Sequence, residues 1–296
     1  MNSYRGRLRP PVLLCAKSDG AEIITYVSRV EHISPEALYP LITNTIFLGR
    51  VHHYESVEST NTVAMKAADS GAVEGTTFIA EEQTAGRGRN GHQWNSERGA
   101  GIYCSIVLRP RLSPSESLLL SMMAGIAVFD AVERLTGARA DLRWPNDVLF
   151  TDRKFCGILM ELSAEANRVN HVVIGIGINV NRTEFPKELE AVATSIRTAT
   201  GRVTSRIELL AALLQSLDRE YKEFTADPVQ AKKKLFREFS ERSSYVRAAR
   251  VHVDEEGGYD GITMGLDERG FLRVQTLNGM RTVMNGGVRK VVARVR

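Results

Sequence analysis

The stretch GRGRNG, residues 86–91, places three glycines and two arginines within six residues, between two apolar runs typical of strands. Glycine lets a backbone approach a ligand more closely than a β-carbon allows, and arginine offers a fixed fork of donors that suits carboxylate or phosphate. The stretch therefore predicts a loop that closes on an anion and shields it from water. Two other interpretations stay open: a long flexible hairpin loop, and an arginine–glycine segment that binds RNA.

Two further stretches carry polar groups at the starts of strands. RWPNDVLF holds Asn146 and Asp147, which suit a ribose, a base edge or phosphate-bound Mg²⁺, although Asn-Asp after proline is also common turn chemistry. KFCGILMEL begins with Lys154, whose ammonium either neutralises anionic reactants or lies solvated at a strand end. Strict alternation puts Lys154 and Gly157 on opposite faces, so they share one pocket only at a strand edge or a bulge.

HVVIGIGINVN, residues 171–181, alternates between two very different faces. One face is apolar, and the other presents Gly175, Gly177 and Asn179. The missing side chains make room either for a flat ligand or for a closely packed helix, and both interpretations stay open. The spacing is not GxGxxG followed by a helix, which disfavours a Rossmann nucleotide site.

Capping signals and periodicity predict the elements that would position these residues. The clearest helix begins with Ser113 at the cap and Pro114 after it, has Glu116 completing a capping box, and ends at Gly137. Other helices are predicted at 35–43 after a cap at Ser34, from a capping residue among Ser59, Thr60 and Asn61 to Gly71, at 207–224 and at 229–242. Strands are predicted at 76–82, 101–110, 147–150, 154–162 and 171–180. After Tyr245, short β-rich runs separated by glycine turns predict a small barrel.

The composition is that of an ordinary globular protein, with 43% hydrophobic and 25% charged residues among 296. A net charge of +4, with arginines spread along the chain, gives little support for nucleic-acid binding. Three cysteines form no CxxC pair and six histidines show no HExxH or similar spacing, so neither a disulfide framework nor a thiolate zinc site is indicated. No apolar run is long enough for a signal-peptide core or a bilayer span, so we expect a cytoplasmic protein.

Five motifs, in this order, resemble those of the biotin protein ligases, also called biotin-[acetyl-CoA-carboxylase] ligases: ESTN (58–61), EEQTAGRGRNGHQW (81–94), RWPNDV (143–148), KFCGILMEL (154–162) and GIGINVN (175–181). The resemblance implies an α/β (α+β) catalytic domain like that of class II aminoacyl-tRNA synthetases, with a mixed or antiparallel sheet and flanking helices, followed by an SH3-like barrel. It divides the chain into a leader of unknown role (1–45), a catalytic domain (46–244) and the C-terminal barrel (245–296).

The reaction of that family has two steps. The carboxylate of biotin attacks the α-phosphate of ATP to give biotinyl-5′-adenylate, and a lysine of a biotin carboxyl-carrier protein or domain of acetyl-CoA carboxylase then attacks the adenylate, releasing AMP. The first step opposes two anions, whose repulsion the arginines and backbone donors of GRGRNG would neutralise. The resemblance thus implies ATP, Mg²⁺ and biotin as ligands and the carrier as partner. We expect no nucleic acid, no membrane, and a monomer or homodimer.

The resemblance also assigns roles to individual residues. Catalytic roles fall to Lys154, Arg87 and Arg89, with Lys154 bridging the biotin carboxylate and the α-phosphate. The biotin site would comprise Ser59, Thr60, Asn61, Gln83, Arg87, Gly88, Arg89, Lys154 and Gly157. The nucleotide site would comprise Arg89, Trp94, Asn146, Asp147, Lys154 and Asn179. No metal ligand is assigned.

Three positions depart from the family pattern. Asn90 and His92 stand where many relatives have arginines, which lowers the positive charge of the loop, and Gly287 stands where the family usually has a glutamate. The segment before residue 46 shows no helix-turn-helix pair, so we expect a ligase without the DNA-binding domain that some members carry. A lipoate or octanoate ligase on the related fold, and a biotin-responsive DNA-binding regulator, remain alternatives.

Overall fold

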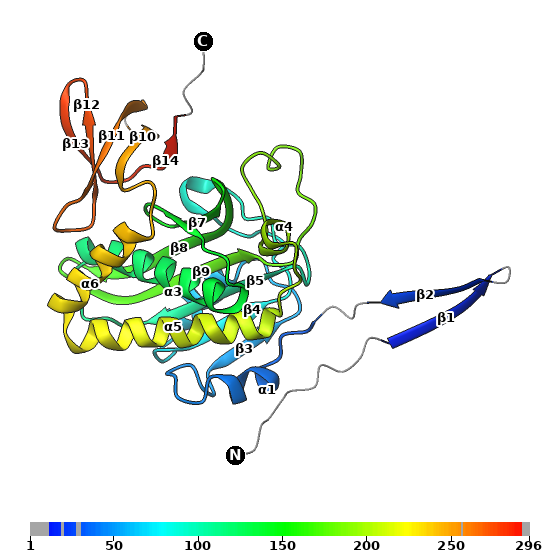
Figure 1. The fold of residues 1–296 in the computed structure, drawn as a ribbon. Helices are drawn as coiled ribbons and strands as arrows, with labels where there is room; N and C mark the ends of the chain where they lie inside the picture. Colours follow the sequence, from blue (N-terminus) through cyan, green and yellow to red (C-terminus); the bar gives the residue numbers. More distant parts are fainter. Residues whose placement is uncertain (1–11, 19–20, 28–30, 256, 292–296) are drawn as a thin grey trace, which may run out of the picture.

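A seven-stranded sheet forms the centre of the molecule (Figure 1). The computed structural model describes residues 12–18, 21–27, 31–255 and 257–291. The strand order is β3-β4-β5-β9-β8-β7-β6, in which β3 and β4 run parallel and the other neighbours antiparallel. The strands are β3 (Val51–Tyr54), β4 (Thr77–Ala80), β5 (Gly101–Leu108), β6 (Asp141–Arg143), β7 (Asp147–Phe150), β8 (Arg153–Glu165) and β9 (Arg168–Asn179).

Three helices cover one face of this sheet (Figure 1): α3 (Leu118–Thr136), α5 (Arg206–Ala226) and α6 (Pro228–Glu241). The capping box predicted at Ser113 and Glu116 is present, and Gly137 ends α3 in a left-handed conformation with φ 69°. The first turn differs from the prediction, because Pro114–Glu116 forms a 3₁₀ turn and α3 begins only at Leu118. A short helix that the sequence did not reveal, α4 (Ile196–Thr200), follows the loop after β9.

Helix α2 (Thr60–Asp69) lies on the opposite face. It packs Ala64 and Ala68 against a small apolar cluster with Phe78 of β4, Val107 of β5 and Val173 of β9. Ser59, one of the three residues expected to cap this helix, occupies the N-cap position, but its side chain makes no capping bond.

Gln83 supplies that cap instead, since its Oε1 accepts from the backbone N–H of Thr60 at 2.9 Å. The start of the helix is therefore fixed by the segment that leads into GRGRNG. Since α2 covers only part of its face of the sheet, room remains beside it above β8 and β9.

The prediction left open how Lys154 and Gly157 might face one pocket, and the pairing of β7 with β8 resolves it. Val148 pairs with Cys156 while Leu149 pairs with Lys154, so the register shifts and Phe155 is the extra residue of a bulge. A bulge reverses the alternation of side chains beyond it. Lys154 and Gly157 consequently line the same cavity.

The C-terminal part forms a second, five-stranded antiparallel sheet in the order β13-β12-β11-β10-β14. Its strands are β10 (Arg247–Val253), β11 (Tyr259–Leu266), β12 (Leu272–Thr276), β13 (Gly279–Val283) and β14 (Val288–Lys290). Trp144 Nε1 donates to the carbonyl of Gly270 at 3.0 Å, and Asp152 accepts from Tyr245 Oη at 2.7 Å and from Lys290 Nζ at 2.9 Å. These contacts fix the small sheet against the end of the large one. The predicted fold class is confirmed.

The N-terminal part adds a hairpin of β1 (Val12–Ser18) and β2 (Ala21–Val27) and one short helix, α1 (Pro35–Leu38), which continues as a 3₁₀ turn, η1 (Tyr39–Leu41). The predicted helix at 35–43 is thus shorter and begins at the expected cap, Ser34. Ile33, Leu38 and Ile42 are at most 1% exposed and belong to the core beneath the large sheet. The last part of the predicted leader is therefore continuous with that core, while residues 1–11, 19–20 and 28–30 lie outside the described residues.

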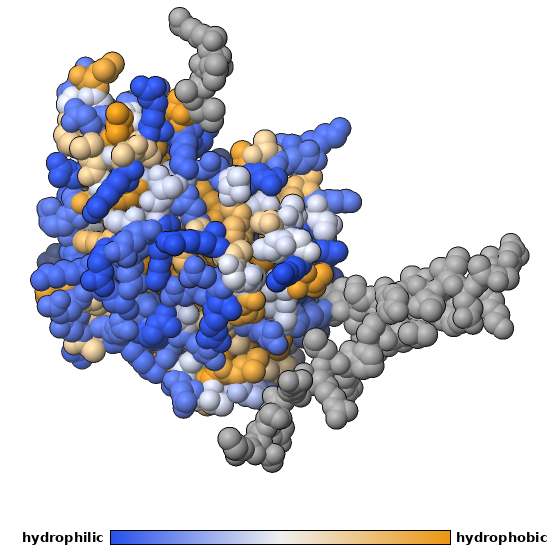
Figure 2. All heavy atoms as spheres, viewed as in Figure 1, coloured by the Kyte–Doolittle hydropathy of each residue, from blue (hydrophilic) through white to orange (hydrophobic). Residues whose placement is uncertain are grey.

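Polar residues cover most of the face drawn in Figure 2, where apolar residues are scattered in small groups. In the described part of the chain, no helix combines the length and the apolar character that crossing a membrane requires.

Candidate functional site

A cavity of about 360 Å³ opens beside the N-terminus of α2, over strands β8 and β9. Its floor is the bare backbone of Gly157, Gly175 and Gly177. A Cβ added at Gly177 would lie 2.6 Å from Cε2 and Nε1 of Trp94, and one at Gly157 would lie 2.9 Å from Cζ3 of the same ring. Only glycine lets a flat ring lie this close to the sheet.

The sequence left two interpretations of the glycine face open, a flat ligand and a closely packed helix, and each of them applies to a different glycine. A Cβ at Gly175 would meet Asn61 Oδ1 of helix α2 at 2.0 Å, so this glycine makes room for a helix. Gly177 instead makes room for the ring of Trp94, which comes from the lid loop (residues 84–99). A flat group already lies where the sequence predicts a flat ligand.

Trp94 has an incomplete environment in this position. Its Nε1 is buried, and no partner accepts from it within the described part of the chain. A buried donor without an acceptor costs about 1–3 kcal/mol. A ligand that moved the ring would also remove this cost. We therefore expect a ligand to displace the Trp94 ring from the cavity floor.

A network of side chains forms the closed end of the cavity. Gln83 Oε1 accepts from Thr60 Oγ1 at 3.1 Å, and Ser105 Oγ lies 2.8 Å from Thr60 Oγ1 and 2.6 Å from Asn61 Oδ1. Asn61 Nδ2 donates to Glu161 Oε2 at 2.9 Å. Each group is held by a neighbour, so the pattern of donors and acceptors is fixed before a ligand arrives.

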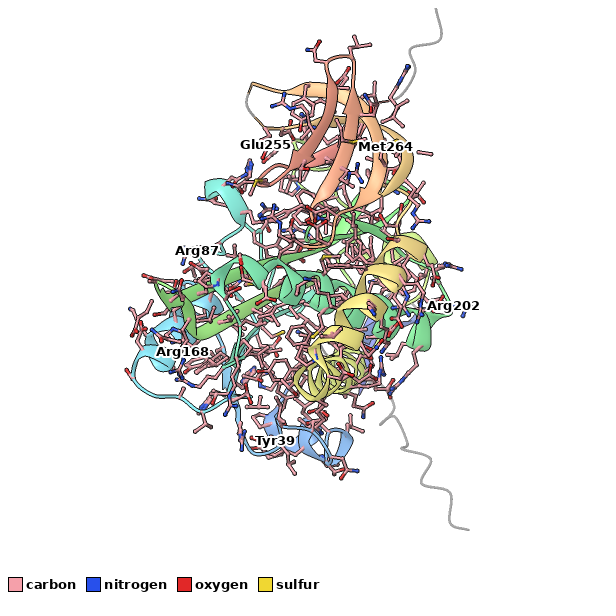
Figure 3. All side chains as sticks on the ribbon, turned by 90° about the vertical axis from the view of Figure 1, so that its left-hand side faces the viewer. Tyr39, Arg87, Arg168, Arg202, Glu255 and Met264 are labelled. Carbon is pink, nitrogen blue, oxygen red and sulfur yellow. The ribbon has the colours of Figure 1, made fainter. Side chains whose placement is uncertain are left out.

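The arginines of the lid loop are docked onto the strands. Arg87 donates to Glu161 Oε1 at 2.8 Å, and Arg89 donates to Asn146 Oδ1 at 2.9 Å and to Asn285 Oδ1 at 3.4 Å. Burial lowers the pKa of Arg89, and the nearby carboxylate of Asp147 opposes that change. Figure 3 shows Arg87 on the side of the molecule between Arg168 and Glu255 of the C-terminal part. The loop is thus folded over the cavity by contacts with both sheets.

Lys154 stands beside a carboxylate that already has a second cation. Its Nζ lies 3.4 Å from Asp147 Oδ1 and 5.6 Å from the centre of the Trp94 ring, while Arg143 donates to Asp147 Oδ2 at 2.6 Å. Although burial lowers the pKa of Arg143, Asp147 raises it above the ordinary value. Asp147 therefore positions Lys154. Because this one carboxylate faces two cations, Arg143 and Lys154, the group keeps a net positive charge.

A second cavity, of about 350 Å³, adjoins the first. Both are lined by Trp94, Asn146, Asp147 and Lys154, so these residues form the wall between the two cavities. The second cavity alone is lined by Asn179, whose Nδ2 donates to the carbonyl of Thr194 at 3.1 Å. The C-terminal sheet and the turn before β14 contribute Asp254 and Gly287 to both cavities.

Cys104 also lines the first cavity, but it is no candidate nucleophile. Burial raises the pKa of its thiol to about 12, and burial likewise raises the pKa of Cys156 well above the ordinary range. A thiol in that state holds its proton at neutral pH. The chemistry of the cavity therefore rests on its cations, amides and backbone.

Comparisons with known proteins agree with this geometry. The Biotin/lipoate A/B protein ligase family model matches residues 54–179, which include α2, the lid loop and strands β4 to β9. The chain is 35% identical over 233 residues to the biotin--[acetyl-CoA-carboxylase] ligase of Mycobacterium tuberculosis, covering 76% of this chain and 82% of the relative. The chain belongs to the biotin protein ligase family.

Two further members of the family show the same relationship. The bifunctional ligase/repressor BirA of Bacillus subtilis strain 168 is 33% identical over 238 residues, covering 80% of this chain and 72% of the relative. The biotin protein ligase from Aquifex aeolicus, solved in complex with biotin and ATP, superposes with a TM-score of 0.70 and 30% identity, covering 82% of this chain and all of that one.

The residues that the family resemblance assigned are gathered around the two cavities. The first cavity is lined by all nine residues predicted for biotin: Ser59, Thr60, Asn61, Gln83, Arg87, Gly88, Arg89, Lys154 and Gly157. Those predicted for the nucleotide divide between the cavities, since Arg89 lines only the first and Asn179 only the second. The departing residues Asn90, His92 and Gly287 also line the first cavity.

Sequence reasoning missed two residues that hold the site together. Glu161 binds both Arg87 and Asn61, and Ser105 joins Thr60 to Asn61. Alternation from Gly157 places Glu161 on the cavity side of β8, so the pattern of that strand carried a signal for it. No sequence pattern marked Ser105 or the contributions of Asp254.

Proposed function

We propose that this chain activates biotin with ATP to biotinyl-5′-adenylate and transfers the biotinyl group to a lysine of a biotin carboxyl-carrier protein or domain of acetyl-CoA carboxylase. The observation that carries the proposal is the position of Lys154 on the wall between two adjoining cavities. A cation at that border is suited to hold a carboxylate in one cavity against a phosphate in the other.

Biotin is assigned to the first cavity, with its ring system on the glycine floor and its carboxylate toward Lys154. The ring would replace Trp94 on Gly177 or press it aside, which the unpartnered Nε1 of that side chain favours. The hydrogen-bond network around Thr60 and Asn61 offers fixed polar groups to a cyclic urea. Arg87, half exposed at the rim, then closes over the carboxylate.

ATP is assigned to the second cavity, with its α-phosphate at Lys154 and Arg89. Asn146 and Asn179 supply amides, and Trp94 supplies an aromatic face for the base. Asp147 is already paired with Arg143 and Lys154, so it suits the positioning of cations better than the binding of another one. We therefore assign Mg²⁺ to the triphosphate, entering as part of the substrate.

Each step follows from these positions. A carboxylate oxygen of biotin attacks the α-phosphorus, the bond to the bridging oxygen breaks, and pyrophosphate leaves with the electron pair. Lys154 and the lid arginines offset the negative charge that builds up on the phosphate oxygens. In the second step a neutral lysine amine of the carrier attacks the acyl carbon, AMP leaves, and the amine gives up its proton. Lys154 acts by charge and forms no covalent bond.

The test is mass spectrometry of the purified protein incubated with Mg²⁺-ATP and, separately, biotin, lipoate or octanoate. We expect biotinyl-adenylate alone, followed by a mass gain on a carrier domain when one is added. Lipoyl- or octanoyl-adenylate would move the activity to the related acyl ligases. The absence of any adenylate would overturn the assignment.

We also propose a ligase that acts without binding DNA, in the cytoplasm. Ahead of β3, the described residues comprise a hairpin and one four-residue α-helix and include no helix-turn-helix pair. Cys104 and Cys156 are free thiols, which suits a reducing compartment. A gel-shift assay with DNA upstream of biotin-synthesis genes tests the first point, and sequence-specific binding would refute it.

A further inference from the structure

Three side chains that take no part in the proposed reaction converge where the N-terminal segment meets the edge of the large sheet. They are His32 before α1, His53 on β3 and Glu81 just after β4. One ligand atom of each lies within 4.8 Å of the others, which no other group of histidine, cysteine and carboxylate side chains within the described residues achieves. The residues are far apart in sequence, so no motif reveals them.

The separations within the group are long for hydrogen bonds, although the contact of His53 with Glu81 still counts as one, and they are ordinary for shared coordination. His53 Nε2 lies 3.4 Å and His32 Nδ1 3.5 Å from the same oxygen, Glu81 Oε1. Zn²⁺ holds nitrogen and oxygen ligands at about 2.1 Å, and two such ligands on a tetrahedron are about 3.4 Å apart. The separations within the group therefore match the edges of a zinc tetrahedron.

The remaining distance requires a small movement. If the two histidine nitrogens are as much as 4.8 Å apart, closing to a tetrahedral edge takes a shift of at most about 1.4 Å. His32 can supply it, since its side chain is 53% exposed, whereas those of His53 and Glu81 are 13% and 4% exposed. Two ligands are thus fixed and one is adjustable.

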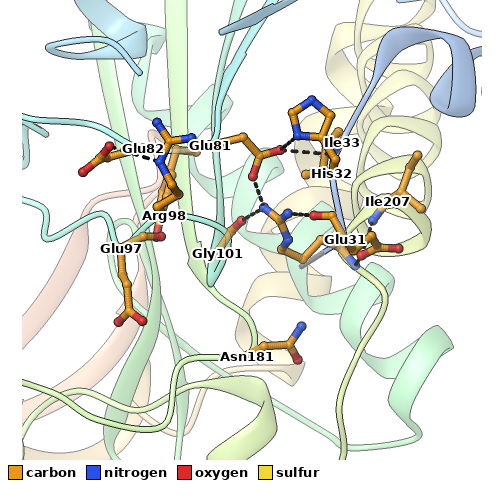
Figure 4. A network of polar contacts seen from close by, with 12 residues as sticks. Glu31, His32, Ile33, Glu81, Glu82, Glu97, Arg98, Gly101, Asn181 and Ile207 are labelled. Atoms are coloured by element: carbon orange, nitrogen blue, oxygen red, sulfur yellow. Dashed lines mark hydrogen bonds and ion pairs between the residues drawn. The ribbon is translucent and has the colours of Figure 1, made fainter. Parts of the chain in front are cut away.

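Glu81 is held in one orientation. Its Oε1 accepts from the backbone N–H of Ile33 at 3.0 Å and its Oε2 accepts from Arg206 at 2.7 Å (Figure 4). These two bonds hold Oε1 within 3.5 Å of one nitrogen of each histidine.

The surroundings supply the other features of a metal site. The second ring nitrogen of His32, Nε2, lies 3.4 Å from Glu55 Oε1, so a carboxylate can fix the tautomer that leaves Nδ1 free to bind. Three carboxylates, of Glu31, Glu55 and Glu81, stand around the group against two guanidinium groups, of Arg98 and Arg206. The local charge is therefore negative when both histidines are neutral, which attracts a cation.

We propose that His32 Nδ1, His53 Nε2 and Glu81 Oε1 bind one divalent transition-metal ion, Zn²⁺ by ligand chemistry, with water as the fourth ligand. Two imidazoles and one carboxylate form a ligand set that zinc accepts. The ion ties residue 32 to β3 and to the end of β4. Because Gln83, which caps α2 and borders the biotin cavity, follows Glu81 by two positions, the ion also anchors the start of the lid loop.

The test is titration of the full-length, metal-stripped protein with Co²⁺, which reports tetrahedral coordination by its visible d–d bands, and with Zn²⁺ by calorimetry. We expect one equivalent of either ion, abolished in His53→Gln and in His32→Gln. Glu55→Gln should weaken binding about tenfold, as loss of a group that orients a ligand does.

The matched control is His52→Gln. His52 neighbours His53 but lies on the opposite face of β3, stacked on Phe78 with 5.1 Å between ring centres. This variant should bind Co²⁺ as the wild type does. A second control is His252→Gln, which removes the histidine paired with Asp260.

Thermal unfolding gives an independent reading. Saturating Zn²⁺ should raise the melting temperature of the wild type and of His52→Gln, and should leave that of His53→Gln unchanged. The comparison is made within each variant, so a change in the stability of the metal-free protein does not affect it. Equal loss of Co²⁺ binding in the His52 and His53 variants, or no binding by the wild type, would overturn the proposal.

Discussion

Replacing Gly177 by alanine puts a methyl group 2.6 Å from Cε2 and Nε1 of Trp94. Atoms of this kind pack at about 3.5–4.0 Å, so the overlap is about 1 Å. The strand cannot yield, because Gly177 pairs with Tyr103 on one side and with Gly157 on the other. Overpacking on this scale costs about 1–3 kcal/mol.

The cost should fall on the biotin complex more than on the free protein. In the free protein the Trp94 ring can rotate away from the floor, whereas the ring system of a bound ligand must rest there. A penalty of about 1–3 kcal/mol corresponds to a dissociation constant about 5- to 150-fold higher. We therefore expect Gly177→Ala to weaken biotin binding within that range while the protein stays folded.

Isothermal titration calorimetry with biotin measures this effect. The matched control is Gly125→Ala in helix α3, where the added Cβ meets nothing closer than Leu142 Cδ2 at 3.6 Å. That variant should bind biotin as the wild type does, and its melting temperature should be unchanged or slightly higher. Wild-type affinity in Gly177→Ala would show that the bound ring does not lie on the glycine floor, and the reasoning would fail.

Three further predictions follow from the site and the sheet. Lys154→Ala should slow biotin-dependent pyrophosphate release by about 10²- to 10³-fold with little change in melting temperature, whereas Lys290→Ala, outside both cavities, should keep the wild-type rate. Glu161→Gln releases the half-exposed Arg87, so biotin affinity should fall by roughly 1 kcal/mol, about fivefold; unchanged affinity would remove Glu161 from the positioning of the lid. Burial lowers the pKa of His171, so the unfolded state binds the proton more readily, and stability should fall as the pH drops below about 6.5. Urea unfolding of His171→Asn should show a shallower loss over that window, and an identical loss would contradict this account.

Signals confined to a few neighbouring residues predicted the fold well. The cap at Ser113 and the stop at Gly137 depend only on local hydrogen bonds and a left-handed turn, and the structure has both. Strands β3 (VHHY) and β6 (DLR) were missed because neither is an apolar run, whereas β4 (TFIA) and β7 (DVLF), which are as short as β3, are mostly apolar. The cap of α2 was expected from the residues just before the helix, whereas Gln83 supplies it and is brought there by tertiary packing.

The same distinction between local signals and tertiary packing applies to the site. Alternation in β9 correctly separated a core face from a glycine face, because the period of a strand is fixed by its backbone. Whether a ring or a helix covers each glycine depended on where Trp94 and Asn61 come to lie, which the strand itself does not determine. Lys154 and Gly157 line the same cavity because of the bulge at Phe155. A bulge adds one residue to a strand, and nothing in this sequence indicates where that residue lies.

The two tryptophans of this chain have different environments, so intrinsic fluorescence can report ligand binding without an added label. Trp144 is 1% exposed, donates to the carbonyl of Gly270 and does not line the first cavity, so its emission should stay constant when biotin binds there. Trp94 lies on the cavity floor with an unpartnered Nε1, so its emission should change when the ring moves. Stopped-flow fluorescence can then separate two orders of events. If the ring must leave before biotin enters, the observed rate will level off at the rate of ring departure as the biotin concentration rises, and if biotin enters first, the early rate will rise in proportion to concentration.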